Sequence, residues 1–124
     1  MTFQVYTESI NEFAPLNHIE TDFPLSANWI RSNDGFVGFG ELASKEFIGS
    51  NRFADARIWW QEFLNQTEII NEVKGSGSGP ILFTSFSFDE NEISKIVVPE
   101  ILVGRKNGKN WITWFGDNKK PILK

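Results

Sequence analysis

KIVVPEILVGRKNGKNWITWF, residues 95–115, is the segment that decides the fold. Asn-Gly favours the positive φ angles of a two-residue hairpin turn. The sequence therefore predicts a long strand over Lys95–Lys106, a turn at Asn107-Gly108 and a returning strand over Lys109–Phe115. Counting outward from this turn gives the paired residues: Val103 with Ile112 and Ile101 with Trp114.

Both strands of this hairpin are apolar on both faces. In the returning strand, Trp111 and Phe115 lie on one face, and Ile112 and Trp114 lie on the other. An antiparallel sheet with one face in water would show polar residues on that face. One helix can cover only one face, so we expect a further layer against the other.

A second hairpin is predicted by Asp34-Gly35, which joins the apolar runs Ala27–Ser32 and Phe36–Leu42. With the turn at these two residues, Arg31 lies opposite Gly38 and Trp29 opposite Gly40.

The two glycines leave a trough without side chains, which a large ring can cover. We expect Trp29 to cover Gly40 as core packing. The alternative is that the glycines admit a ligand or a partner backbone.

A helix is predicted over residues 52–66, RFADARIWWQEFLNQ, with Ser50 or Asn51 as its N-cap. Its apolar residues recur at spacings of three and four, which predicts one buried stripe. The stripe consists of Phe53, Ala56, Trp60, Phe63 and Leu64. The remaining expected elements are an opening strand over 3–8, an irregular connection over 9–26, a buried strand over Ile81–Phe88 and a polar turn over Asp89–Glu92.

The order of strands, hairpin, helix and further strands predicts an α+β fold: a mainly antiparallel β-sheet with one principal helix packed on one face. The length of 124 residues fits a single domain, which we place at residues 1–116. Residues 117–124 are then a tail or the start of a linker.

Composition excludes several classes of protein. The net charge is −4 and the twelve Lys and Arg residues are scattered, so no basic stripe predicts nucleic-acid binding. The absence of Cys excludes disulfides and thiolate metal sites and suits the cytoplasm. No apolar run reaches the roughly 18 residues of a membrane span, and the N-terminus is not a signal peptide.

The sequence contains no nucleophilic or phosphate-binding motif. His18, the only histidine, lies in the irregular connection and is interpreted as a surface or turn residue. The loop Gly75–Pro80 ends in proline before a strand, whereas a phosphate loop precedes a helix N-terminus. We interpret it as a flexible connection.

The carboxylates do not predict a metal-binding or acid/base site either. Asp89, Asn91 and Glu100 match positions one, three and twelve of a calcium loop, but the central glycine is missing, which favours a solvated turn. Glu41, Glu46 and Glu100 are acid/base candidates that the sequence does not bring together. Glu100, inside an apolar strand, fits an edge beside proline or a domain interface better than a buried ion pair. We therefore assign no catalytic, cofactor-binding or metal-binding residue.

Four segments resemble the N-terminal region of isochorismate synthases of the menaquinone pathway, in the same order and with similar spacing. These segments are residues 35–41, GFVGFGE; 52–60, RFADARIWW; 77–89, GSGPILFTSFSFD; and 97–105, VVPEILVGR.

The resemblance implies one half of a larger chorismate-enzyme α/β sandwich that converts chorismate to isochorismate with Mg²⁺. The family's catalytic lysine and glutamates belong to its C-terminal region, so the resemblance implies an inactive structural domain. Its partner is then the C-terminal catalytic region of the same enzyme, as part of one chain or as a split subunit, and a homodimer is expected for the isolated domain. Siderophore and salicylate pathways remain alternatives to menaquinone. The alternative function is a free-standing binding module that presents aromatic residues.

Overall fold

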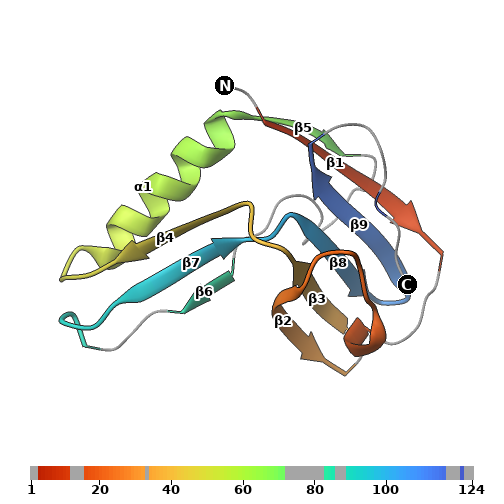
Figure 1. Ribbon diagram of the computed structural model, residues 1–124, viewed down its shortest axis with the longest axis horizontal. Coiled ribbons are helices and arrows are strands. Elements are labelled where there is room, and N and C mark those ends of the chain that lie inside the picture. The colour runs from red at the N-terminus through yellow and green to blue at the C-terminus, as the bar shows by residue number, and fades with distance from the viewer. Residues whose placement is uncertain are drawn as a thin grey trace.

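The computed structural model describes residues 3–11, 16–32, 34–71, 83–85, 89–116 and 121 (Figure 1). Its elements are, in chain order, β1 (Phe3–Ile10), the 3₁₀ turn η1 (Leu16–His18), β2 (Leu25–Arg31), β3 (Asp34–Phe39), β4 (Ala43–Phe47), α1 (Arg52–Asn65), β5 (Thr67–Asn71), β6 (Phe83–Ser85), β7 (Ser94–Val98), β8 (Ile101–Lys106) and β9 (Lys109–Phe115). Within these residues, no helix is long and apolar enough to cross a membrane.

The described strands form two sheets. The larger sheet has the order β2-β3-β8-β9-β1-β5, and the smaller sheet has the order β4-β7-β6. All neighbours pair antiparallel except β1 and β5, which pair parallel. With one helix beside the sheets, the predicted α+β class is confirmed.

The Asn107-Gly108 hairpin has the predicted register. Asn107 and Gly108 have φ angles of 52° and 79°, the left-handed conformations of a tight hairpin turn. Lys106 therefore pairs with Lys109, and the ladder continues through Val103 with Ile112 and Ile101 with Trp114.

The long strand predicted over residues 95–106 is wrong, because the chain leaves one sheet and enters the other at Pro99-Glu100. Before this point β7 pairs in the smaller sheet, and after it β8 pairs in the larger one. Proline has no N–H to donate to a ladder, which favours a break here. The Glu100 N–H instead donates to the Phe39 carbonyl at 3.0 Å, and the Glu100 carbonyl accepts from the Phe115 N–H at 3.2 Å.

The register predicted for the first hairpin is also wrong. Arg31 pairs with Asp34, so the turn lies two residues before Asp34-Gly35, and Trp29 faces Phe36 instead of Gly40. Gly35 lies inside β3 with φ 138°, where a Cβ would be only 1.9 Å from the Trp29 carbonyl oxygen. This glycine allows two strands to approach closely and does not form the turn.

Different side chains cover the glycine trough. At Gly38 a Cβ would meet Phe83 and Pro99 at 2.9 Å, and at Gly40 it would meet Glu100 and Phe23 at 3.2–3.3 Å. The core-packing interpretation is correct for this trough, but Trp29 has no part in it and is 60% exposed.

Helix α1 begins and ends close to the predicted positions, but its apolar stripe differs. Phe53 is 53% exposed, whereas Ala56 and Phe63 are buried. Asn51 is the N-cap residue but makes no side-chain capping bond. The buried side of the helix therefore includes Trp59 instead of Phe53. Trp59 packs against the cluster of Ala56, Phe47 and Ile96 at the smaller sheet.

The helix connects the two sheets. Ala56 contacts Phe47 of β4 and Ile96 of β7, so the middle of α1 covers the smaller sheet. Near its end, Phe63 meets Phe115 of β9 edge to face, with ring centroids 5.9 Å apart. Figure 1 shows α1 running along β4 and ending beside β5.

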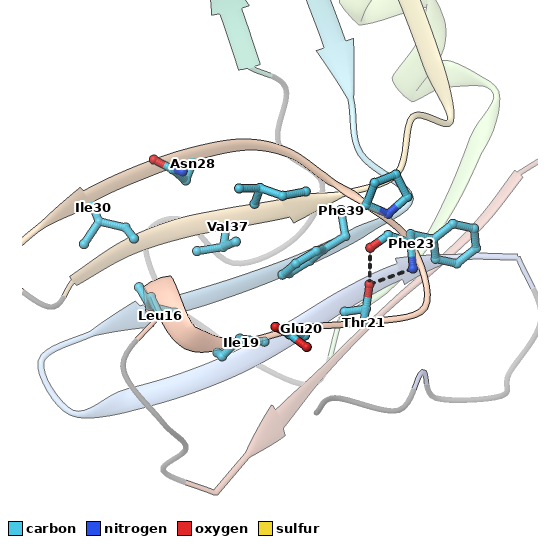
Figure 2. A pocket seen from close by; sticks show the side chains of 11 residues that line it. Leu16, Ile19, Glu20, Thr21, Phe23, Asn28, Ile30, Val37 and Phe39 are labelled. Atoms are coloured by element: carbon cyan, nitrogen blue, oxygen red, sulfur yellow. Dashed lines mark hydrogen bonds between the residues drawn. The ribbon is translucent and has the colours of Figure 1, made fainter.

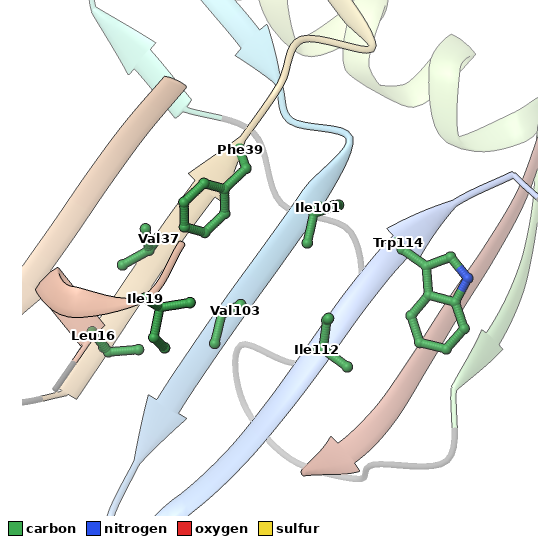
Figure 3. Close-up of a cluster of buried hydrophobic side chains, with 8 residues drawn as sticks. All are labelled: Leu16, Ile19, Val37, Phe39, Ile101, Val103, Ile112 and Trp114. Carbon is green, nitrogen blue, oxygen red and sulfur yellow. The ribbon is translucent and has the colours of Figure 1, made fainter. Parts of the chain in front are cut away.

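The main core lies on one face of the larger sheet, under η1 (Figure 3). Its buried members are Leu16, Ile19, Val37, Phe39, Ile101, Val103, Ile112 and Trp114. Leu16 and Ile19 are 1% and 5% exposed, and they cover β3 and β8 on this face.

The other face of the central strands is buried as well. Trp111 and Thr113 are 4% and 1% exposed, and the Thr113 hydroxyl is hydrogen-bonded to that of Thr7 at 2.8 Å. The further layer that we expected is therefore supplied by the chain itself. The two-faced apolar pattern needs no second polypeptide to explain it.

Two predictions lie partly outside the described residues. Of the strand predicted over residues 81–88, only β6 is described, and Thr84 and Ser85 are exposed, so the expected burial is wrong there. The predicted flexible loop Gly75–Pro80 lies outside the described residues. So does the tail over 117–124, apart from Pro121.

Candidate functional site: an apolar pocket at the edge of the larger sheet

A pocket of about 410 Å³ opens between η1, the segment that follows it, and the β2–β3 hairpin (Figure 2). The lining residues are Leu16, Ile19, Glu20, Thr21, Phe23, Pro24, Leu25, Asn28, Ile30, Val37 and Phe39. Four of these, Leu16, Ile19, Val37 and Phe39, also belong to the main core. The pocket is thus the open end of the core, at the outer edge of the sheet.

Segment 19–25 folds over the sheet through local hydrogen bonds. The Thr21 hydroxyl accepts from the Phe23 N–H and donates to the Phe23 carbonyl, each at 3.0 Å. The Pro24 carbonyl accepts from the Gly40 N–H at 2.8 Å, which fixes the end of the segment to β3. Three apolar side chains near this segment remain exposed: Phe23 at 43%, Leu25 at 56% and Ile30 at 37%.

The pocket is suited to binding apolar groups. Its polar side chains are Glu20, Thr21 and Asn28, and the Thr21 hydroxyl is already engaged with the Phe23 backbone. The described lining residues contain one carboxylate and no Lys, Arg or His. Such a lining suits a neutral or cationic apolar group and disfavours an anion.

The sequence did not reveal this pocket, because residues 9–26 were predicted to be an irregular connection. One signal was present. Leu16 and Ile19 are apolar and three residues apart, which is the spacing that places side chains on one side of a 3₁₀ turn.

The candidate residues predicted from the sequence are not among the described residues that line the pocket. His18 is exposed at the end of η1, as interpreted from the sequence. Asp89 and Asn91 form the predicted polar turn, with the Asp89 Oδ1 accepting from the Asn91 N–H at 2.9 Å. The whole of β7 separates this turn from Glu100, so the calcium-loop positions do not converge.

The candidate acid/base carboxylates also do not converge. Glu41 forms an ion pair with Lys95 at 3.7 Å, and both side chains are about half exposed. Glu46 is exposed on β4, opposite Lys95 in the ladder. Glu100 is half-buried at the crossing between the sheets. Its N–H and C=O bond to Phe39 and Phe115 on either side, so the predicted edge position is wrong, and the domain interface stays a prediction.

No group of three or more His, Cys, Asp or Glu side chains in the described ranges could hold a metal ion.

Comparison with known proteins gives one match. No curated protein and no solved structure matches the chain. A family model described as "Chorismate binding enzyme" matches residues 2–116, which is nearly the whole sequence. The chain therefore belongs to the chorismate-binding enzyme family.

Proposed function

We propose that this chain is a structural domain of an isochorismate synthase of the menaquinone pathway, located in the cytoplasm and inactive by itself. The observation that carries this proposal is the family match over residues 2–116. In the proposed enzyme, a C-terminal region supplies the groups that convert chorismate to isochorismate.

The positions of the resembling segments support a structural role. Residues 35–41 contain most of β3, residues 52–60 begin α1, and residues 97–105 span the crossing from β7 to β8. These elements hold the two sheets together, and Val98, Ile101 and Val103 are almost fully buried. The resembling segments thus lie mainly in the scaffold, and residues 35–41 also supply Val37 and Phe39 to the pocket lining.

The pocket does not suit the substrate. Chorismate carries two carboxylates, whereas the lining of the pocket offers one carboxylate and no cationic side chain. The carboxylates of chorismate and the carboxylate of Glu20 would repel each other in this pocket.

The Mg²⁺ of the proposed enzyme also finds no fitting set of ligands in the described residues. Magnesium prefers oxygen ligands, usually one or two carboxylates together with substrate and water. The nearest candidates, Glu41 and Glu46, flank Lys95, and the carboxylate of Glu41 is already paired with its ammonium group. The carboxylates of the described residues therefore take no part in the proposed reaction.

The test is an isochorismate assay. The purified chain, incubated with chorismate and Mg²⁺, should give no isochorismate above a protein-free control. Co-expression with a C-terminal chorismate-binding region should give turnover. Ile96→Asp, which puts a charge into a core position that is 1% exposed, should abolish this rescue, whereas Ser44→Asp on exposed β4 should preserve it. Turnover by the chain alone after rigorous purification contradicts the proposal.

A second candidate is a free-standing binding module, which the open apolar pocket favours. The same co-expression separates the two, because a binding module gives no isochorismate with that region.

A further inference from the structure

The outer strand of the larger sheet, β2, has no second neighbour among the described strands. It pairs with β3, with a β-bulge between Leu25 and Ala27, and from Ala27 to Arg31 its other edge faces no described strand (Figure 1). Proteins usually block such edges with charges, proline or a covering segment, because an open edge pairs readily with another strand. Across its seven residues β2 contains one charged residue, Arg31, and no proline, and it exposes Leu25, Trp29 and Ile30.

The register shows which backbone groups of β2 point outward. Two residues separate Arg31 from its partner Asp34, so this pair closes the hairpin and exchanges hydrogen bonds. Hydrogen-bonded positions alternate along a strand, so Trp29 also directs its N–H and C=O toward β3. Asn28 and Ile30 direct theirs toward the open edge.

We propose that β2 of a second copy of this chain pairs antiparallel with β2 across a twofold axis at Asn28. The two larger sheets would then join into one continuous sheet. An isologous contact needs a surface that is complementary to itself, and an antiparallel strand pair centred on an outward-pointing residue satisfies this requirement. This inference concerns assembly and does not depend on the proposed function.

The side chains of β2 match in this register. Trp29 of one copy lies opposite Ala27 of the other, so a large ring meets a small residue. This pair is a non-hydrogen-bonded one, in which side chains come closest. On the other face Ile30 approaches Ser26 of the second copy, the residue that the bulge in β2 leaves without a partner in β3. Asn28 and Ile30 are on the pocket side of β2 (Figure 2), so Ile30 extends the second copy's apolar pocket wall.

The charges match as well. Arg31 of the second copy lies toward the N-terminal end of β2, where the bulge ends the regular pairing and the preceding segment carries Glu20 and Asp22. Both acidic residues are exposed, and Glu20 lines the pocket. No like charges face each other, because Arg31 is the only charged residue in the strand. The contact thus brings a cation to an acidic rim at both ends.

Disulfide cross-linking tests the register directly, because the chain contains no cysteine. Asn28→Cys places two thiols at the twofold axis, where the Cα atoms of a hydrogen-bonded pair are about 5.5 Å apart, within the range of a disulfide. Ser26→Cys is the matched control on the same strand. Its thiols would be four residues out of register, about 13 Å apart, and could not be bridged.

On mild oxidation we expect a disulfide-linked dimer for Asn28→Cys at micromolar protein and at least a tenfold lower yield for Ser26→Cys. Equal yields overturn the proposal, since they indicate random collision. Absence of cross-linking in both also overturns it, and assigns the edge to another occupant such as a strand of a catalytic region.

Light scattering gives an independent measurement on the unmodified chain. We expect a mass of twice 14.2 kDa that falls on dilution. Asn28→Lys places two ammonium groups opposite each other and should raise the dissociation constant about tenfold or more. Ser44→Lys, which adds the same charge to exposed edge strand β4, should leave it unchanged. A monomer at millimolar concentration refutes the pairing.

Discussion

Replacing Gly104 by alanine should destabilise the protein because the Trp111 indole lies directly on this glycine. The two residues are cross-strand partners in β8 and β9. A Cβ on residue 104 would lie 2.4 Å from Trp111 Cε2, 2.5 Å from Nε1 and 2.6 Å from Cζ2. Ordinary carbon contacts are about 3.5–4.0 Å, so the ring must move by about 1 Å or more.

The ring has little freedom to move. Trp111 is 4% exposed, and it also meets the Phe36 ring edge to face at 6.3 Å. Within the described part of the chain its indole N–H has no acceptor, so packing alone holds the ring in place. Moving it therefore forfeits contacts on both sides.

Two opposing effects decide the magnitude. Alanine restricts the unfolded chain more than glycine, which favours the variant by about 0.5–1 kcal/mol. Overpacking of a core costs about 1–3 kcal/mol. The cost of the clash should exceed the entropic gain, with a net loss of about 1–2 kcal/mol in the free energy of unfolding. For a chain of this size that corresponds to a fall in Tm of about 4–10 °C.

A double-mutant cycle provides the assay, with urea unfolding followed by far-UV circular dichroism. In a Trp111→Leu background the indole is gone, so Gly104→Ala should be neutral or slightly stabilising. The coupling free energy between the two positions should then be about 1.5–3 kcal/mol. If Gly104→Ala has the same cost in both backgrounds, the indole does not lie on this glycine and the reasoning fails.

Three further changes test the packing. Phe63→Ala should lower the free energy of unfolding by about 3–4 kcal/mol, because the Phe63 ring packs against three other aromatic rings. Phe53→Ala, on the exposed side of the same helix, should lower it by less than about 1 kcal/mol. Equal melting temperatures for the two variants would contradict the orientation of the helix. Thr113→Val should cost about 1–2 kcal/mol by leaving the buried Thr7 hydroxyl without its partner, and the Thr7→Val, Thr113→Val double variant should recover most of the loss in urea unfolding. Glu41→Gln removes a half-exposed ion pair and should change the free energy of unfolding by less than about 0.5 kcal/mol, in low or high salt. A larger loss that depends on salt would contradict this expectation.

Local chemistry explains why the sequence alone determined the Asn107-Gly108 hairpin and the extent of α1. The two turn residues require positive φ angles that asparagine and glycine tolerate, so they fix both the turn and the register of β8 against β9. The helix follows from a periodicity contained within its own residues. The α+β class follows from the order of these elements.

Only the tertiary structure decided which elements pair beyond the two hairpins, because that pairing depends on residues far apart in the sequence. Pro99 marks a break in an apolar run, but nothing local shows that β7 and β8 enter different sheets. Asp34-Gly35 is a good turn signal, yet the turn forms two residues earlier because Gly35 is needed where β2 approaches β3 closely. The pocket depends on Leu16 and Ile19 reaching across to β3, and a non-local contact of this kind leaves no periodic pattern in the sequence.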